Sequence, residues 1–178
     1  MPIEKKSGQV TLCVDLRAVN RAVLREPYPI PSFEELTSKF NGATVFSTLD
    51  ARSGYHQIAL DEDSSLYTTF ITHRGRFCFN RLPFGITSAS EIFQRKMEAI
   101  LQGCEGIVVY QDDILVYGPN IKEHDNRLQI ALKKIAEHGL QLNDEKCKYR
   151  QASVRFLGHM FDSKGTQPDP TRYEPSKP

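Results

Sequence analysis

The sequence predicts one α+β domain, an antiparallel β-sheet with helices packed on one face. Three observations indicate this fold class. Several short runs alternate apolar and polar residues or are continuously apolar, as strands do. Two longer stretches repeat their apolar residues at helical spacing. These elements do not follow a regular βαβ order, and a length of 178 residues suits one compact domain with its own core.

The first half of the chain is expected to hold short strands and one short helix. In order, these are a strand over 9–15, an extended proline-rich connector over 27–31, a helix over 32–40, a strand over 44–50, and paired strands over 67–71 and 76–79 around a turn at 73–75. Alternating side chains predict the strands. Ser32 predicts the helix start, because Glu35 three positions later completes a capping box, and Gly42 ends the helix.

The second half has the stronger periodicity. A helix over 88–101, strands over 107–110 and 114–117, a helix over 123–138 and a last strand over 154–160 are expected in that order. Apolar residues three and four positions apart predict both helices, and Gly139 ends the second. The polar, proline-rich segment after Gly165 is expected to be an unstructured tail.

Composition excludes several classes of function. A formal net charge of +1 gives no overall positive field, so nucleic-acid binding would need a local groove. Six basic residues are candidates to line one, or are ordinary solvated charges: Arg17, Arg52, Arg74, Arg76, Arg81 and Lys96. The four cysteines are scattered, which argues against a zinc site and for free thiols in a reducing compartment.

The hydropathy of the sequence does not predict a membrane-spanning segment. No apolar run approaches the roughly 18 residues of a membrane span, and the first residues do not resemble a signal peptide. We therefore expect a soluble intracellular protein of the cytoplasm, with the nucleus as the alternative compartment.

Two adjacent carboxylates, Asp112 and Asp113, interrupt the apolar strands over 107–117. A simple turn is one interpretation, because Asp favours turns. However, adjacent like charges repel, and a hairpin that needed only a turn is better served by Asn-Gly. Asp50 ends another apolar strand and would be a third carboxylate if that strand lies beside the hairpin. Oxygen ligands without His or Cys suit Mg²⁺, so the turn and the metal site both remain open.

Five sequence blocks stand out along the chain. They are Cys13-Val14-Asp15-Leu16-Arg17-Ala18-Val19-Asn20, Leu49-Asp50-Ala51-Arg52-Ser53-Gly54-Tyr55-His56-Gln57-Ile58, Arg81-Leu82-Pro83-Phe84-Gly85-Ile86-Thr87-Ser88-Ala89, Tyr110-Gln111-Asp112-Asp113 and Phe156-Leu157-Gly158-His159. These blocks resemble those of reverse transcriptases and occur in that family's order. The fourth block is similar to the Y-x-D-D motif. Over about Lys5 to Pro170 the combination resembles the polymerase domain of gypsy-type LTR retrotransposons and their retroviral relatives.

The resemblance implies an RNA-directed DNA polymerase, a nucleotidyltransferase that adds a dNTP to a primer 3′-hydroxyl on an RNA or DNA template. It implies partial fingers over 1–45, a palm over 46–165 and a disordered tail over 166–178, with no thumb. Asp50, Asp112 and Asp113 would be the catalytic residues and hold two Mg²⁺ ions, with Mn²⁺ as an alternative. No membrane partner is expected, and a partner subunit remains unknown.

The resemblance also implies roles for other residues, each with a plainer alternative. Tyr55, Phe84, Gly85 and Lys6 would bind the nucleotide, with Tyr55 crowding a 2′-hydroxyl; the alternatives are packing and an ordinary loop. Tyr110, Phe156, Leu157, Gly158 and His159 would bind the primer; the alternatives are core and edge strand. Lys146 falls near the sequence position of a lysine that polymerases use to protonate pyrophosphate; the alternative is an ordinary surface lysine.

The sequence departs from the family in three ways. Thr11 stands where the family usually has a basic residue that contacts the triphosphate, and Lys5 and Lys6 lie near enough to replace it in part. Gln111 stands where an apolar residue is more common. The thumb, connection and RNase H segments are expected to be missing. Two alternatives therefore stay open, a catalytically silent palm-fold module that binds nucleic acid or a partner, and an unrelated α+β protein.

Overall fold

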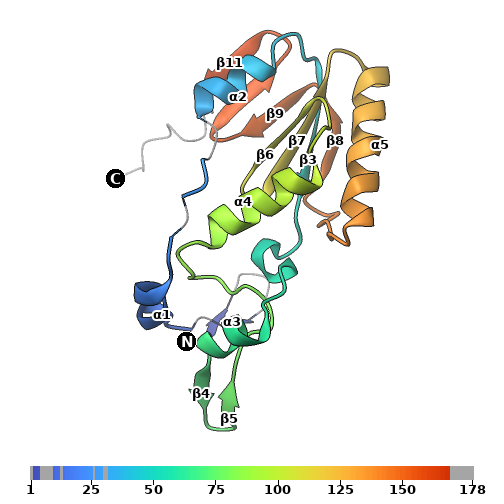
Figure 1. The fold of residues 1–178 in the computed structure, drawn as a ribbon. Helices are drawn as coiled ribbons and strands as arrows, with labels where there is room; N and C mark the ends of the chain where they lie inside the picture. The colour runs from blue at the N-terminus through green and yellow to red at the C-terminus, as the bar shows by residue number, and fades with distance from the viewer. Residues whose placement is uncertain (1, 5–9, 13, 26, 30–31, 169–178) are drawn as a thin grey trace. The chain divides into compact units, whose positions relative to one another are not determined.

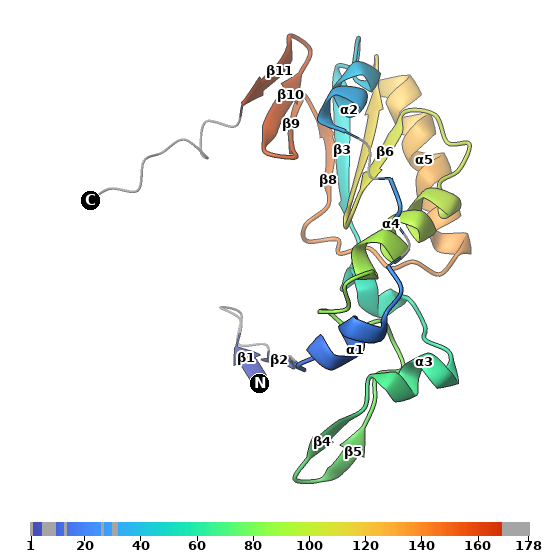
Figure 2. The same ribbon diagram turned by 60° about the vertical axis from the view of Figure 1, so that its left-hand side comes forward.

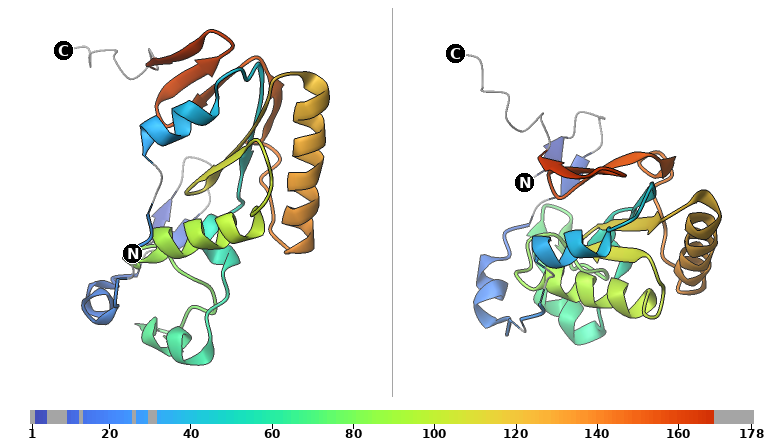
Figure 3. Two further views of the ribbon diagram at one scale, coloured as in Figure 1. Left: turned by 45° about the horizontal axis from the view of Figure 1, so that its top comes forward. Right: turned by 90° about the horizontal axis from the view of Figure 1, so that it is seen from above.

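The computed structural model describes residues 2–4, 10–12, 14–25, 27–29 and 32–168. The chain forms two compact units. Unit 1 consists of Met1–Tyr28 and Ser53–Arg95, and unit 2 consists of Pro29–Arg52 and Lys96–Pro178. Figure 1 and the further views in Figure 3 show the ribbon of both units.

Unit 2 is built on a four-stranded antiparallel sheet. Its strands, in spatial order, are β6 (Ile107–Tyr110), β7 (Asp113–Gly118), β3 (Val45–Asp50) and β8 (Lys148–Gln151). The predicted strands over 44–50, 107–110 and 114–117 are confirmed within a residue or two. The antiparallel α+β class that the sequence predicts is confirmed as well.

Helix α5 (Ile121–Glu137) packs on one face of this sheet, against β7 and β3. Asn120 caps it, because its side chain accepts a hydrogen bond from the Glu123 backbone N–H. Gly139 follows the helix with φ at +68°, a left-handed conformation that glycine adopts without strain. The helix buries His124, Ala131 and Ile135, so the predicted amphipathic helix over 123–138 is confirmed.

The opposite face of the sheet is covered by helix α2 (Phe33–Lys39) and by a second, three-stranded sheet (Figure 2). That sheet contains β9 (Ser153–Phe156), β10 (His159–Asp162) and β11 (Gly165–Pro168). Their shared core is a set of buried side chains: Leu36, Phe40, Ala43, Phe46, Val108, Leu115, Val154, Phe156 and Phe161. The predicted Ser32–Glu35 capping box is present at the start of α2.

Three features of unit 2 correct the sequence predictions. The single strand expected over 154–160 is two strands, because Leu157 and Gly158 both have positive φ and form a tight turn. The first residues of the segment expected to be unstructured form a strand, since β11 pairs with β10; residues 169–178 lie outside the described residues. Strand β8 was not predicted, because its side chains are polar and all exposed.

Unit 1 contains shorter elements. They are β1 (Pro2–Glu4), β2 (Val10–Leu12), α1 (Arg17–Ala22), the 3₁₀ helix η1 (Gly54–Gln57), α3 (Glu62–Tyr67), β4 (Phe70–Thr72) and β5 (Gly75–Phe77). The hairpin of β4 and β5 confirms the predicted strand pair, although Tyr67 belongs to α3 and not to a strand. Asp61 caps α3, a polar helix too short to show periodicity. Helix α4 (Ala89–Ile100), also predicted, begins in unit 1 and ends in unit 2.

Within the described part of the chain, no helix is long and apolar enough to span a membrane. Three of the four cysteines, Cys78, Cys104 and Cys147, are described, and all three are free thiols, as expected.

Candidate active site

The backbone of unit 2 brings the three predicted carboxylates to one end of the central sheet. Asp50 is the last residue of β3 and Asp113 is the first residue of β7, and the two are direct partners in the antiparallel register. Residues that face each other in such a pair project their side chains from the same face. Asp112 lies in the turn between β6 and β7, where its carbonyl oxygen accepts a hydrogen bond of 3.3 Å from the Ala51 N–H. The strand that ends at Asp50 therefore lies beside the hairpin.

The turn that presents Asp112 is conformationally unusual. Gln111 has φ at +52°, in the left-handed region that non-glycine residues seldom occupy. With only Gln111 and Asp112 between the paired residues Tyr110 and Asp113, the turn is as short as a hairpin allows. Such backbone strain is concentrated at functional sites in proteins. Tight hairpin turns usually contain Asn or Gly. Because Gln111 takes that place here, the sequence signal for a tight turn is weak.

The carboxylates of this turn resist ionisation. Burial raises the pKa of Asp112, and the negative charges of Asp113 and Asp50 raise it further. Burial and the charge of Asp50 likewise raise the pKa of Asp113. Solvent screens the charge of Asp113 more than that of Asp112, because the Asp113 side chain is the more exposed of the two. The Oδ1 atom of Asp112 is buried without a hydrogen-bond partner, an arrangement that costs free energy in a charged group.

A lysine offsets part of this negative charge. Lys146 Nζ lies 3.3 Å from Asp50 Oδ2, and its charge lowers the pKa of both Asp112 and Asp113. The contact is supported by the backbone, because the Asn143 N–H donates to the Asp50 carbonyl oxygen at 2.9 Å. The Lys146 N–H in turn donates to the Asn143 carbonyl oxygen at 2.9 Å. Sequence analysis placed Lys146 near the site only through its resemblance to polymerase lysines.

The donor chemistry of the three carboxylates fits a divalent cation. All offer oxygen atoms, which Mg²⁺ and Mn²⁺ prefer, and a cation would relieve both the mutual repulsion and the unpartnered Asp112 Oδ1. In the described residues, however, no three Asp, Glu, His or Cys side chains already form a group arranged to hold a metal ion. The backbone thus brings the three carboxylates to one end of the sheet.

Three of the predicted nucleotide-binding residues lie together in unit 1. Tyr55 is half-buried on η1, and its ring centroid is 5.1 Å from that of Phe84 and 5.7 Å from that of Phe93. Phe84 keeps 49% of its surface exposed. Gly85 follows with φ at +98°, a conformation that requires glycine. Lys6, the fourth predicted residue, lies outside the described residues.

Asn20 secures the loop that carries Phe84 and Gly85, a contact that sequence analysis missed. From α1 its Nδ2 donates to the Gly85 carbonyl oxygen at 2.7 Å, and its Oδ1 accepts from the Thr87 N–H at 3.0 Å. One side-chain amide therefore links two of the five family blocks. The only sequence signal was that Asn20 belongs to the first block, because a contact 65 residues away leaves no local pattern.

We expect Asn20→Ala to lower the free energy of unfolding of the protein by about 1–2 kcal/mol, because two hydrogen bonds of about 1 kcal/mol each are lost from this loop. Urea denaturation measures the change. Asn20→Asp is the comparison variant, since it keeps an acceptor for Thr87 but sets a carboxylate oxygen against the Gly85 carbonyl oxygen. Because these two oxygens repel each other, it should also be less stable than the unmutated protein, and equal stability of Asn20→Ala and the unmutated protein would contradict the role.

The predicted primer-binding residues divide into core and turn. Phe156 is only 3% exposed and packs in the core of unit 2, with its ring centroid 6.5 Å from that of Tyr110. Tyr110 is half-buried at the end of β6. Leu157, Gly158 and His159 are half-exposed in and after the β9–β10 turn, where the His159 ring Nδ1 contacts the Leu157 carbonyl oxygen at 3.1 Å. A packing role therefore describes Phe156, and the turn residues remain available to a ligand.

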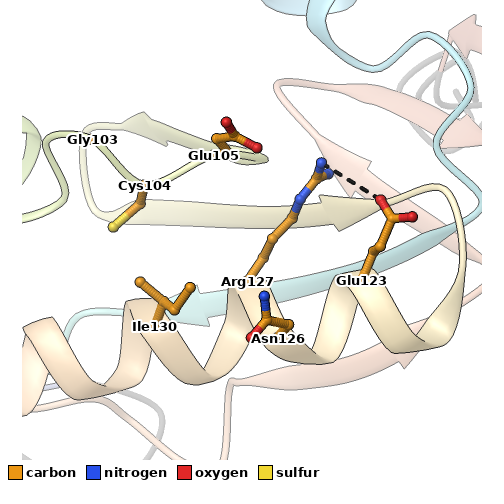
Figure 4. Close-up of a pocket in the computed structure, with 7 residues that line it drawn as sticks. All are labelled: Gly103, Cys104, Glu105, Glu123, Asn126, Arg127 and Ile130. Carbon is orange, nitrogen blue, oxygen red and sulfur yellow. Dashed lines mark ion pairs between the residues drawn. The ribbon is translucent and has the colours of Figure 1, made fainter.

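A hollow on the surface of unit 2 does not contain the predicted site (Figure 4). Its volume is about 330 Å³, and its lining residues are Gly103, Cys104, Glu105, Glu123, Asn126, Arg127 and Ile130. Arg127 and Glu123, one turn apart on α5, form an ion pair of 3.9 Å at its edge. The hollow adjoins the start of β6, whereas Asp112 follows the end of that strand, so the two are separate.

Comparison with known proteins decides the family. The family model described as reverse transcriptase (RNA-dependent DNA polymerase) matches residues 3–161. The chain belongs to the reverse transcriptase family. This membership excludes the reading of an unrelated α+β protein, and the expected likeness to gypsy-type and retroviral Pol polyproteins is confirmed.

Curated relatives of this reverse transcriptase domain are much longer proteins. The Retrovirus-related Pol polyprotein from transposon 297 of Drosophila melanogaster is 33% identical over 173 residues, which cover 96% of this chain and 16% of the relative. That from transposon gypsy of the same organism is 34% identical over 90% of this chain and 16% of the relative. The Enzymatic polyprotein of Figwort mosaic virus is 34% identical over 92% of this chain and 24% of the relative. The chain thus corresponds to less than a quarter of each.

Solved structures show the same fold. The foamy viral protease-reverse transcriptase dRH in complex with ds DNA has a TM-score of 0.85 and 23% identity, and the match covers 99% of this chain and 32% of that chain. The foamy viral protease-reverse transcriptase in complex with RNA/DNA hybrid has a TM-score of 0.79 and 25% identity, over 93% of this chain and 22% of that chain. The reverse transcriptase domain described here therefore has the polymerase fold of these proteins.

Proposed function

We propose that this reverse transcriptase domain carries the catalytic carboxylates of an RNA-directed DNA polymerase. It would transfer a nucleotide from a dNTP to the 3′-hydroxyl of a primer paired with an RNA or DNA template. The observation that carries the proposal is the junction of Asp50, Asp112 and Asp113 at one sheet end, with a buried Asp112 oxygen that lacks a partner. A site built for a cation explains this costly arrangement, and a mere turn does not.

The three carboxylates are proposed to hold two Mg²⁺ ions, with Mn²⁺ as the alternative. When bound, such ions lower the pKa of an attacking hydroxyl and neutralise the charge of a transferring phosphoryl group. The task of the protein is then chiefly to position the reactants and the charges. Asp50 and Asp113 are fixed by sheet register, and Asp112 is fixed by the two-residue turn. Strand pairing and the turn therefore set the backbone positions of all three carboxylates.

We extend the proposal to the residues of unit 1. Tyr55, Phe84, Gly85 and Lys6 would bind the incoming nucleotide, and the Tyr55 ring would crowd a 2′-hydroxyl and so favour deoxynucleotides. The contact between Tyr55 and Phe84, and the positive φ of Gly85, support a shaped aromatic surface there. Tyr110 and the turn residues Leu157, Gly158 and His159 are proposed to contact the primer. Phe156 would support that turn from the core.

Primer extension on poly(rA)·oligo(dT) with Mg²⁺ and dTTP tests the proposed activity. Incorporation by the unmutated chain that disappears in Asp112→Asn is the expected result. Equal background signal from both proteins would refute polymerase activity of this chain.

The second candidate function is a catalytically silent module that binds nucleic acid or a protein partner. The described residues favour it in one respect, since their carboxylates form no ready metal-binding group. Background extension together with salt-dependent binding of the primer–template duplex would identify it, because phosphate contacts weaken as salt rises.

A further inference from the structure

Lys146 is attached to the carboxylate site by more than a chance surface contact. Its ammonium group lies 3.3 Å from Asp50 Oδ2. The turn that carries it is bonded to the Asp50 backbone, because the Asn143 N–H donates to the Asp50 carbonyl and the Lys146 and Cys147 N–H groups both donate to the Asn143 carbonyl. Asp50 and Lys146 therefore lie on backbone segments that are joined by hydrogen bonds.

The charge of Lys146 opposes the repulsion among the carboxylates. The charge of Asp50 raises the pKa of Asp112 and of Asp113, and the charge of Lys146 lowers both. It therefore supplies at this sheet end the kind of compensation that a cation would supply. The same position makes it an obstacle to a cation. An ion about 2.1 Å from Asp50 Oδ2 would have the ammonium group within roughly 5.4 Å, close enough for strong repulsion.

We propose that Lys146 is the counter-charge of the metal-free site, paired with Asp50 until a divalent cation displaces it, and that it thereby sets the affinity of the site for metal. The inference rests on the proposed function, in that the three carboxylates are taken as the metal ligands. Two observations support it. The backbone brings the three carboxylates to one sheet end, and the Lys146 ammonium group lies 3.3 Å from one of them, Asp50.

A plain surface ion pair is the competing explanation. The Lys146 side chain is 65% exposed, and exposed pairs contribute little to stability. Under that explanation, removing Lys146 would affect metal binding no more than removing any other lysine. Lys122 is the matched control, because it is exposed near the start of α5. The start of α5 follows the far end of β7, which begins at Asp113, so Lys122 is about 20 Å from Asp113 by the rise per residue of a strand.

Titration with Mn²⁺ alone, followed by the electron paramagnetic resonance signal of the free ion, tests the inference. K146M is expected to bind Mn²⁺ about five- to tenfold more tightly than the unmutated protein, because one repelling charge is removed. K146R keeps the charge and should bind within about twofold of the unmutated protein, as should K122M. Thermal melts supply the second measurement. Without metal K146M should melt at a lower temperature, and added Mg²⁺ should raise its melting temperature by more than it raises that of the unmutated protein.

The outcomes separate this inference from the proposed function. If D112N weakens Mn²⁺ binding but K146M binds as the unmutated protein does, or more weakly, the role of Lys146 is overturned and the carboxylate site stands. If D112N and the unmutated protein bind Mn²⁺ equally, the carboxylate site itself is overturned. If no variant binds Mn²⁺, both fail. Tighter binding by K122M equal to that of K146M would reduce the effect to net charge and overturn the inference.

Discussion

Asp112→Asn is expected to abolish primer extension, by at least about 10³-fold, and at the same time to make the metal-free protein more stable near neutral pH. Activity falls because a proposed metal ligand loses its charge. Stability rises because Asp112 is held where its charge is unfavourable, next to two other carboxylates and with one buried oxygen unpartnered. The expected gain is on the order of 1 kcal/mol in the free energy of unfolding. Stability and activity thus move in opposite directions.

The pH dependence of this effect follows from the raised pKa of Asp112. Between the ordinary Asp pKa of 3.8 and the raised value, the folded protein retains a proton that the unfolded chain has lost. The unmutated protein therefore loses stability as pH rises through that window. Asp112→Asn has no such group, so its advantage should be present above the raised pKa and should disappear below pH 3.8.

Urea denaturation of both proteins across this pH range, without metal, measures the difference. Asp63→Asn is the control, because Asp63 is exposed in the first turn of α3 and should give no gain. Added Mg²⁺ should stabilise the unmutated protein and leave Asp112→Asn nearly unchanged. A less stable Asp112→Asn at neutral pH would show that Asp112 stabilises the fold and is not strained by it.

His124→Leu is expected to cost about 3 kcal/mol in the free energy of unfolding, the largest stability effect of a single substitution that we predict. His124 is fully buried on α5, and its ring nitrogens contact Ser47 Oγ at 2.8 Å and Asp125 Oδ1 at 3.0 Å. Arg150 closes the network, because its backbone N–H donates to Ser47 Oγ and its guanidinium group donates to Asp125. The network joins α5, β3 and β8.

Leucine fills the volume of His124 but leaves a buried serine hydroxyl without one of its partners. The start of α5 lies close to β7 here, since a Cβ atom at Gly118 would lie 2.7 Å from the His124 backbone nitrogen, and this close packing limits how far the helix can shift toward the strand. Urea denaturation at pH 7 measures the loss. His138→Leu, an exposed site at the end of the same helix, is the control and should cost less than about 1 kcal/mol. Equal losses for the two variants would mean that the network contributes nothing.

The sequence was most informative where physical signals were local. Asp112 and Asp113 stood out because charges interrupt apolar strands, and the helices over 89–100 and 121–137 stood out because their apolar residues repeat. The capping box of Ser32 and Glu35 is likewise a pattern of near neighbours. These features depend on residues within a few positions of one another, so reading along the chain detects them.

What could not be predicted depends on distant contacts. Strand β8 has no apolar alternation, and its place beside β3 is held by Arg150, which has φ at +49° at an irregularity in the pairing. The bond from Asn20 to Gly85 and the pairing of Lys146 with Asp50 join residues far apart in sequence. The two units are also interleaved, each formed from two separate stretches of chain. Local patterns carry no record of such contacts.

Strand β3 has a consequence for how genes of this kind can change. Its side chains alternate between faces, so that Ser47 meets His124 on the α5 side while Asp50 projects, like Asp113, from the other side. A missense change in this strand alters one face at a time. Loss or gain of a single codon between Ser47 and Asp50 would invert the relation of the two residues, and the position of the Asp50 carboxylate and the buried network would be lost together. The segment from Ser47 to Asp50 should therefore tolerate amino-acid substitutions far better than insertions or deletions.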